Sequence, residues 1–136
     1  DVYKKPTLYY SVQIINSQNS ATSFNVYQFA LGRTSGRFIF NKRTGATLTT
    51  LFESAYGYIA DNTWYRIKIT RSVSGVFTAW IRGGSFGDTW TLVSTTDGSG
   101  TNPVTDNAHT TSNYLTFNLD LAGRIGKIKI YDGVRQ

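Results

Sequence analysis

The sequence predicts an all-β protein folded as a two-sheet antiparallel β-sandwich. Aromatic residues make up 15% of the 136 residues, nearly as many as the 16% that are charged, which is unlike the composition of helical or disordered proteins. Apolar and polar residues alternate along much of the chain, and no segment has the period of an amphipathic helix. We expect one domain, residues 1–136, which is long enough to bury a core without disulfides, and the chain has no cysteine.

About nine segments have the length and the alternation of β-strands, and polar or glycine-containing turns separate them. In order they are Leu8–Ile15, Phe24–Leu31, Arg37–Phe40, Ala46–Phe52, Thr63–Thr70, Phe77–Arg82, Thr89–Val93, Tyr114–Leu119 and Ile125–Tyr131. Polar loops are expected at Asn16–Ser20 and Asn41–Gly45. Strands of this number and spacing are typical of a two-sheet sandwich.

The longest segment without a predicted strand runs from Thr95 to Ser112 and consists almost entirely of small polar residues and glycine. Val104 is its one candidate for an apolar anchor. Because so little apolar burial would offset the entropy lost on ordering it, we expect it to lie outside the sheets and to be the least rigid long region.

The clearest hairpin joins Thr63–Thr70 to Phe77–Arg82. Strict alternation places one set of apolar side chains on its inner face, because a slip of one residue would bury Arg66 or Lys68 instead. Together with the last strand, we expect this face to contribute the following core residues: Tyr65, Ile67, Ile69, Phe77, Ala79, Ile81, Ile128 and Ile130.

The outer face of this hairpin carries two of the three tryptophans. With Ser72–Ser74 as the tip of the loop, Trp64 lies opposite Arg82. Arg66 then lies opposite Trp80 in the same way. A guanidinium group over an indole ring gains roughly 0.5–1 kcal/mol at an exposed site. We therefore expect both tryptophans to be structural and covered by the arginines, rather than sugar-binding.

Residues suited to catalysis are scarce, since Glu53 is the only glutamate and His109 the only histidine. Glycoside hydrolysis normally needs two carboxylates on either side of the bond, and no acidic residue lies near Glu53 in the sequence. We interpret Glu53 as a surface residue at the end of a strand. His109 lies in the long polar segment at no spacing that predicts a catalytic triad, so we expect an exposed loop histidine. The protein is not expected to be an enzyme.

Two motifs resemble a known family. The stretch from Asn62 to Ser72, followed by Gly75 to Gly84, resembles the central hairpin of concanavalin A-like and laminin G-like jelly rolls. Arg124–Gly133 is similar to the closing strand of the same family. The resemblance implies a jelly-roll sandwich with lectin-like activity. It also implies an extracellular or virion-surface location, because such modules occur in secreted bacterial proteins and in phage structural proteins.

Lectins of this family often hold calcium in their loops. In Asp97–Asn102 oxygen-bearing side chains alternate as in calcium loops, but a second acidic residue at the right offset is missing. We expect no cofactor and no metal, with calcium at this segment as the alternative.

Carbohydrate binding requires aromatic faces that stack on sugar rings and planar polar groups that bind hydroxyls. The candidate residues are Tyr56, Tyr58, Trp90, Asp97, Asn102, Asp106, Asn107 and His109. Packing within the fold is the alternative role for the aromatic residues among them.

The sequence therefore predicts a non-catalytic carbohydrate-binding module that recognises a glycan or cell-surface polysaccharide. The alternative is a structural or decorating module of a virion (phage capsid or tail) or of another surface assembly, with other subunits as partners and no small ligand. The net charge of +6 would suit an acidic partner, but the basic residues are scattered along the sequence, so nucleic acid is not expected. No apolar stretch is long enough for a membrane helix, and no membrane partner is expected.

Overall fold

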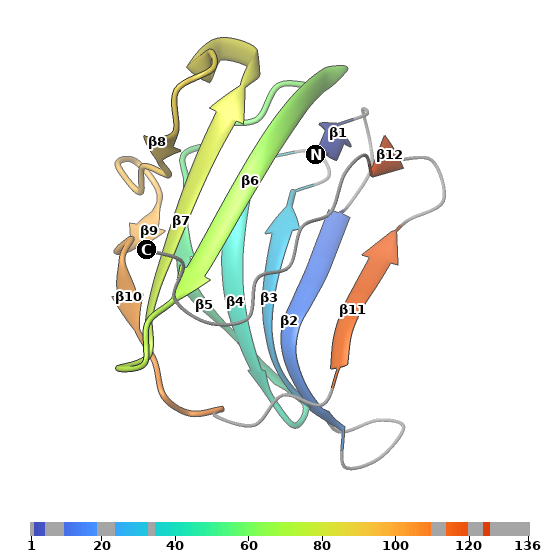
Figure 1. Ribbon diagram of the computed structural model, residues 1–136, viewed down its shortest axis with the longest axis vertical. Helices are drawn as coiled ribbons and strands as arrows, with labels where there is room; N and C mark the ends of the chain where they lie inside the picture. Colours follow the sequence, from blue (N-terminus) through green and yellow to red (C-terminus); the bar gives the residue numbers. More distant parts are fainter. Residues whose placement is uncertain are drawn as a thin grey trace.

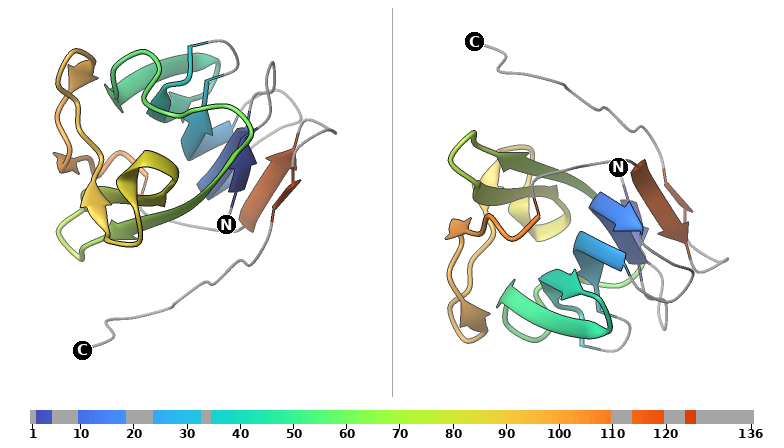
Figure 2. Two further views of the ribbon diagram at one scale, coloured as in Figure 1. Left: turned by 90° about the horizontal axis from the view of Figure 1, so that it is seen from above. Right: turned by 90° about the horizontal axis from the view of Figure 1, so that it is seen from below.

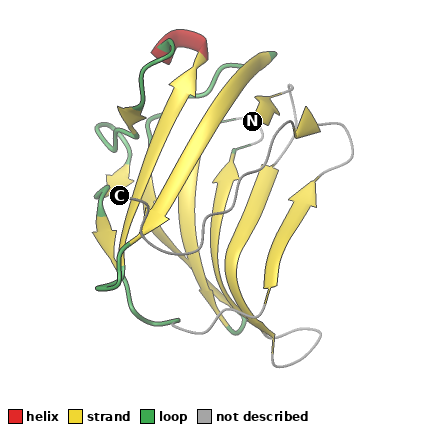
Figure 3. Ribbon diagram, viewed as in Figure 1, coloured by secondary structure: helices red, strands yellow, loops and turns green. Residues whose placement is uncertain are grey.

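A computed structural model describes residues 2–4, 10–18, 24–32, 35–109, 114–119 and 124–125, including the side chains of 25–32 and 35–109. Within these ranges the chain forms two antiparallel sheets that pack face to face, which confirms the predicted β-sandwich (Figures 1 and 2). The only helix of the described residues is a single 3-10 turn, η1 (Gly84–Phe86), at one end of the sandwich (Figure 3).

Sheet A has the strand order β10-β7-β6-β1-β12, with β8 pairing with β7, and its central hairpin lies toward the viewer in Figure 1. Its described strands are β1 (Val2–Lys4), β6 (Thr63–Arg71), β7 (Val76–Gly83), β8 (Thr91–Leu92), β10 (Val104–Thr105) and β12 (Arg124–Ile125). Sheet B has the order β11-β2-β3-β4-β5-β9. Its described strands are β2 (Tyr10–Gln18), β3 (Phe24–Leu31), β4 (Phe38–Thr44), β5 (Thr47–Glu53), β9 (Ser99–Gly100) and β11 (Tyr114–Leu119).

The core between the sheets is built mainly from aromatic rings. Sheet B contributes Tyr27, Phe29, Leu31, Phe38, Phe40 and Phe52, and sheet A contributes Tyr65, Phe77, Ala79 and Ile81. The ring of Phe38 lies nearly parallel to those of Phe29 and Phe52, with centroids 5.9 and 6.1 Å apart. A fully buried side chain of this size contributes roughly 1.5–3 kcal/mol to folding, so these rings supply much of the driving force.

The predicted core of the central hairpin is confirmed in part. Four of its residues are almost completely buried: Tyr65, Phe77, Ala79 and Ile81. Ile67 and Ile69 are only partly buried, although both pack against the core cluster. Ile128 and Ile130 lie outside the described residues.

Strand bounds follow the predictions closely at β3 and β11, which begin and end where expected. β2 and β4 are longer than predicted, because residues 16–18 and 41–44 continue the strands instead of forming polar loops. Polar residues can extend a strand because the bonds between strands come from the backbone. The strand expected at Thr89–Val93 shrinks to the two residues of β8.

The register of the β6–β7 hairpin differs from the prediction by two residues, so that Ile67 faces Ile81 and Ile69 faces Ala79. The cause is the turn: Ser72 pairs with Val76, and Gly75 closes the loop with a φ of 81°. Glycine is favoured at this left-handed position of a three-residue hairpin loop. A shift of two residues keeps every side chain on its predicted face.

The cation over Trp80 is therefore not the predicted one. Lys68 lies opposite Trp80, and its Nζ is 4.1 Å from the ring centroid. Arg66 faces Arg82, so the predicted pairs of Arg66 with Trp80 and of Trp64 with Arg82 are wrong. The predicted face is right, because Trp80 lies on the outer side of sheet A, away from the core.

The segment that begins at Thr95 does not lie outside the sheets, which corrects the prediction. β9 pairs with β5 of sheet B, and β10 pairs with β7 of sheet A. At Gly100 the φ is 70°, and a Cβ would lie only 2.1 Å from the carbonyl oxygen of Leu51. Composition alone missed these contacts because they depend on backbone pairing and not on apolar burial. Residues 110–112 lie outside the described residues.

Candidate binding surfaces

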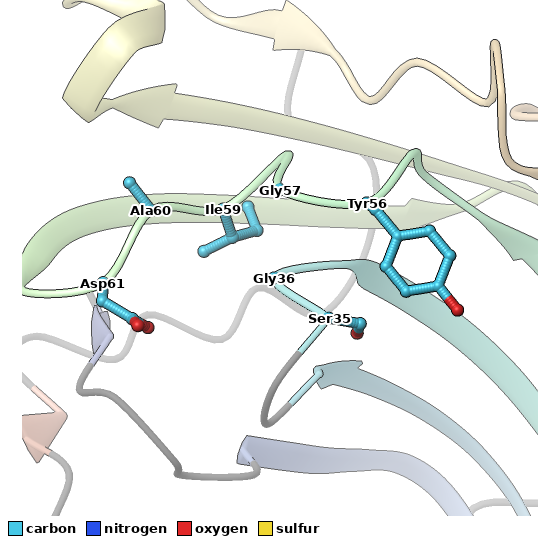
Figure 4. Close-up of a pocket in the computed structure, with 7 residues that line it drawn as sticks. All are labelled: Ser35, Gly36, Tyr56, Gly57, Ile59, Ala60 and Asp61. Atoms are coloured by element: carbon cyan, nitrogen blue, oxygen red, sulfur yellow. The ribbon is translucent and has the colours of Figure 1, made fainter.

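An open pocket of about 320 Å³ lies at the end of the sandwich where β5 ends and β6 begins. It lies between the turn before β4 and the loop from β5 to β6. Backbone hydrogen bonds from Gly57 to Ser35 (2.8 Å) and from Ile59 to Gly36 (2.7 Å) hold the two together. The lining residues are Ser35, Gly36, Tyr56, Gly57, Ile59, Ala60 and Asp61. Figure 4 shows Tyr56 and Asp61 at opposite ends of this row.

Tyr56 is an exposed ring at one end of this pocket, with a cation stacked on it. It is 73% exposed, the largest exposure of any aromatic residue with a described side chain. The guanidinium of Arg37 lies 3.6 Å from the ring centroid, and Arg37 is in turn ion-paired with Glu53. Glu53 ends β5, as expected, and its half-buried side chain holds the arginine in place. The guanidinium supports the tyrosine ring from one side and leaves most of the ring open to solvent.

Trp90 lies on a different surface, the outer face of sheet A. Lys68 Nζ is 5.2 Å from its ring centroid, and the guanidinium of Arg82 is 4.7 Å away. The same lysine contacts Trp80, so indole rings and cations alternate across β6, β7 and the segment before β8. Sequence reasoning included only Trp90 in the candidate site, because the register that groups these four side chains was not known.

Asp106 holds the end of the 95–109 segment to sheet B, at the end of the sandwich opposite the pocket. Its carboxylate accepts hydrogen bonds from the hydroxyl of Tyr27, from Lys42 Nζ (2.5 Å) and from the amide of Ala108 (2.9 Å). Burial alone would raise the pKa of Asp106, but these hydrogen bonds and the charge of Lys42 outweigh it and hold the pKa below 3.8. Burial, followed by the bond to Asp106, raises the pKa of Tyr27 to about 12.

His109 is buried, with 6% exposure, so the expectation of an exposed loop histidine is wrong. Its ring packs on Tyr27 with a centroid distance of 5.2 Å, and its Nε2–H donates to the carbonyl oxygen of Arg43 (2.9 Å). Its neighbour Asn107 accepts from Arg71 (3.2 Å) and donates to the carbonyl of Ser74 (3.1 Å). Both side chains fasten the segment to the sheets. We name Asp106, Asn107 and His109 with Tyr27 and Lys42 the polar clasp.

The side chain of Asn102 makes the hydrogen bonds to β7 that the backbone of a neighbouring strand would otherwise make. Its side-chain oxygen accepts from the amide of Ala79 (3.1 Å), and its side-chain nitrogen donates to the carbonyls of Ala79 and Val93 (2.9 Å each). Asp97 lies apart from it, in an exposed turn with a φ of 59°. The described residues contain no group of three or more acidic or histidine side chains that could hold a metal ion.

Tyr58 packs against the fold. Its ring lies 4.9 Å from that of Phe86, and its hydroxyl oxygen accepts a hydrogen bond from the amide of Ser94 (3.1 Å). The eight candidates are thus spread over several places: only Asp106, Asn107 and His109 come together, while Tyr56 and Trp90 lie on two separate surfaces. Sequence reasoning missed Asp61 and Ser35 at the pocket, and Lys68 and Arg82 beside Trp90. The alternation of the hairpin could have placed Lys68 and Arg82 on the face of Trp80.

No helix in the described parts of the chain is long and apolar enough to cross a membrane. Comparison with known protein families, with curated proteins and with solved structures gives no match to this chain. Its function therefore has to be inferred from its own surfaces.

Proposed function

We propose that this protein is a non-catalytic, lectin-like module that binds a sugar residue of a glycan in the pocket beside Tyr56. The observation that carries the proposal is the exposed tyrosine ring, supported from one side by Arg37 and bordering a pocket. A sugar ring buries its apolar face on such a platform, and a tyrosine side chain loses little conformational entropy on binding because it has few rotatable bonds.

The size and the polar groups of the pocket fit this ligand. A volume of about 320 Å³ lies at the lower end of the range for small-molecule sites, roughly 300–1,000 Å³, and suits one terminal sugar. Asp61 and Ser35 supply a carboxylate and a hydroxyl as hydrogen-bonding groups for sugar hydroxyls. Among the lining residues Asp61 is the one carboxylate, and the nearby Glu53 is ion-paired with Arg37, which favours binding over hydrolysis.

A glycan array followed by titration of the best ligand tests the proposal. Tyr56→Ala should weaken binding about tenfold, equivalent to about 1.4 kcal/mol, whereas Tyr56→Phe should bind like the unmodified protein because it keeps the ring. Leu48→Ala is the matched control, since it removes another exposed apolar side chain (48% exposed) from β5, outside the pocket lining.

Equal affinities of the Tyr56→Ala and unmodified proteins would contradict the pocket as the binding site. An array without any bound glycan, together with assembly of the protein into trimers or larger particles, would favour the structural role in a virion or surface assembly.

A further inference from the structure

Tryptophan and basic side chains lie side by side on the outer face of β6, β7 and the segment that leads into β8. We call the group formed by Lys68, Trp80, Arg82 and Trp90 the indole–cation face. All three tryptophans of the chain lie on this side of sheet A, and Leu92, 43% exposed, lies directly opposite Trp80. In Figure 1 this side of the sheet is turned toward the viewer.

Among the described strand positions that point outward on this face, every charged side chain is basic. The outward positions of β6, β7 and β8 include Arg66, Lys68 and Arg82, and they include no aspartate or glutamate. Arg66 and Arg82 are directly opposed across the two strands, an arrangement in which like charges repel. Asp88 lies in the sequence between Arg82 and Trp90, and its backbone carbonyl accepts a hydrogen bond from Arg82 (3.4 Å).

The indole rings hold two of these cations in place. Lys68 Nζ lies between Trp80 (4.1 Å) and Trp90 (5.2 Å), and the guanidinium of Arg82 lies 4.7 Å from the centroid of Trp90. Long cationic side chains normally lose much rotamer entropy when they bind a ligand. Here part of that entropy is already lost on folding, because Lys68 and Arg82 lie against the indole rings before any ligand binds.

From this arrangement we propose that the indole–cation face binds an acidic polysaccharide through its sulfate or carboxylate groups. Charge complementarity selects a polyanion, and a face that spans three neighbouring strands offers an extended chain several points of contact. Base stacking of single-stranded nucleic acid needs open aromatic faces, whereas Lys68 and Arg82 already lie over the faces of Trp80 and Trp90. The two indoles are partly buried and do not project from the sheet as a membrane-inserting edge would.

The experiment uses heparin as the acidic polysaccharide and dextran as the neutral one, with intrinsic tryptophan fluorescence as the readout. Since all three tryptophans lie on this side of sheet A, heparin should change the fluorescence and dextran should not. The affinity should fall steeply as salt rises, because each cation in contact with a polyanion adds about one unit to the salt dependence.

Two variants that each remove one positive charge show which surface binds heparin. Lys68→Met should weaken heparin binding about tenfold at low salt and lower the slope of log affinity against log salt by about one. Arg43→Met, on β4 of the other sheet, is the matched control and should bind almost normally. Lys68→Arg keeps the charge and should retain binding, and circular dichroism checks that each variant is folded.

Heparin binding that is unchanged in Lys68→Met, or equally weakened in Arg43→Met, would overturn the proposal, because attraction would then come from net charge alone. Tighter binding of a thymidine oligonucleotide or of phosphatidylserine vesicles than of heparin would also overturn it. The proposal is independent of the pocket: Tyr56→Ala should bind heparin normally.

Discussion

The β6–β7 hairpin and the segment from Thr95 to His109 are held in the fold by different forces. The hairpin buries one face of apolar side chains, and Phe77, Ala79 and Ile81 each retain no more than 1% of their exposure. The segment contributes one partly buried apolar side chain, Val104, to the core. It is held mainly by the backbone pairing of β9 and β10 and by side-chain amides, a carboxylate and an imidazole that form hydrogen bonds to distant strands. A polar, glycine-rich segment can therefore be ordered when its backbone pairs with neighbouring strands and its side chains bond to the remaining backbone groups.

The largest loss of stability is expected from a cavity in the apolar core beneath the β6–β7 hairpin. Ile81→Ala removes a side chain with 0% exposure that faces Ile67 across the hairpin. Lost transfer energy and the cavity left behind should lower the free energy of unfolding by about 2–5 kcal/mol. Urea denaturation measures this directly. An unchanged midpoint would show that the hairpin is not a main source of stability.

A single substitution in the polar clasp should lower the free energy of unfolding almost as much. Asp106→Ala leaves the hydroxyl of Tyr27 and the ammonium of Lys42 without their common acceptor, in a site where the aspartate side chain is 11% exposed. We expect a loss of about 2–3 kcal/mol, less than for a fully buried pair because Lys42 is partly exposed. The control for charge is Asp97→Asn, which removes the charge of an exposed aspartate and keeps a residue that tolerates the φ of 59° at this position. If both variants unfold at the same urea concentration, the clasp contributes little.

Loss of the Asn102 side chain should have a smaller and more local effect. Asn102→Ala leaves the buried amide and carbonyl of Ala79 with fewer partners and should cost about 1–3 kcal/mol. Hydrogen exchange at the Ala79 amide should become faster than the lower free energy of unfolding alone explains. Exchange at Ile67, in the neighbouring strand β6, should accelerate only by the amount that the lower free energy of unfolding predicts. Uniform acceleration along β7 would instead indicate that Asn102 supports the whole strand.

The smallest expected effect is a gradual loss of stability as the pH falls. Because the folded-state pKa of Asp106 lies below its ordinary value, the unfolded chain binds more protons as the solution is acidified. The stabilisation is fully present above an unfolded pKa of about 3.9 and is lost as pH falls through the folded pKa. Stability of the unmodified protein should therefore decrease more steeply below about pH 4 than that of Asp106→Asn. Parallel curves for the two proteins would contradict this contribution.

The sequence predicted what depends on local alternation. The fold class, the bounds of β3 and the inner face of the hairpin all follow from a period of two, which is visible within a few residues. The register needed one more fact, that Gly75 and not Ser74 ends the turn. The two-residue error kept the faces but exchanged the partner of Trp80.

The candidate site was harder to predict because its contacts span long distances in the sequence. Tyr27 and Asp106 are 79 residues apart, and His109 bonds to Arg43 across 66 residues. Nothing near these residues in the chain indicates such partners, so an internal role could not be distinguished from a ligand-binding one. Tyr56 was identified because a tyrosine beside Gly57 in a turn is a local signal, whereas the support from Arg37 is not.

The short strands β8, β9 and β10 also affect how molecules of this protein meet one another. A bare β5 or β7 would offer a row of unpaired amides and carbonyls, which is a template for strands of other chains and a start for aggregation. Each of these strands has only two residues, which is short for pairing with another chain. Between β8 and β10 the side-chain amide of Asn102 bonds to the amide and the carbonyl of Ala79, which therefore offer no free partners to a strand of another molecule. The polar segment thus covers part of the free edges of β5 and β7, where pairing with the strands of another molecule would otherwise start.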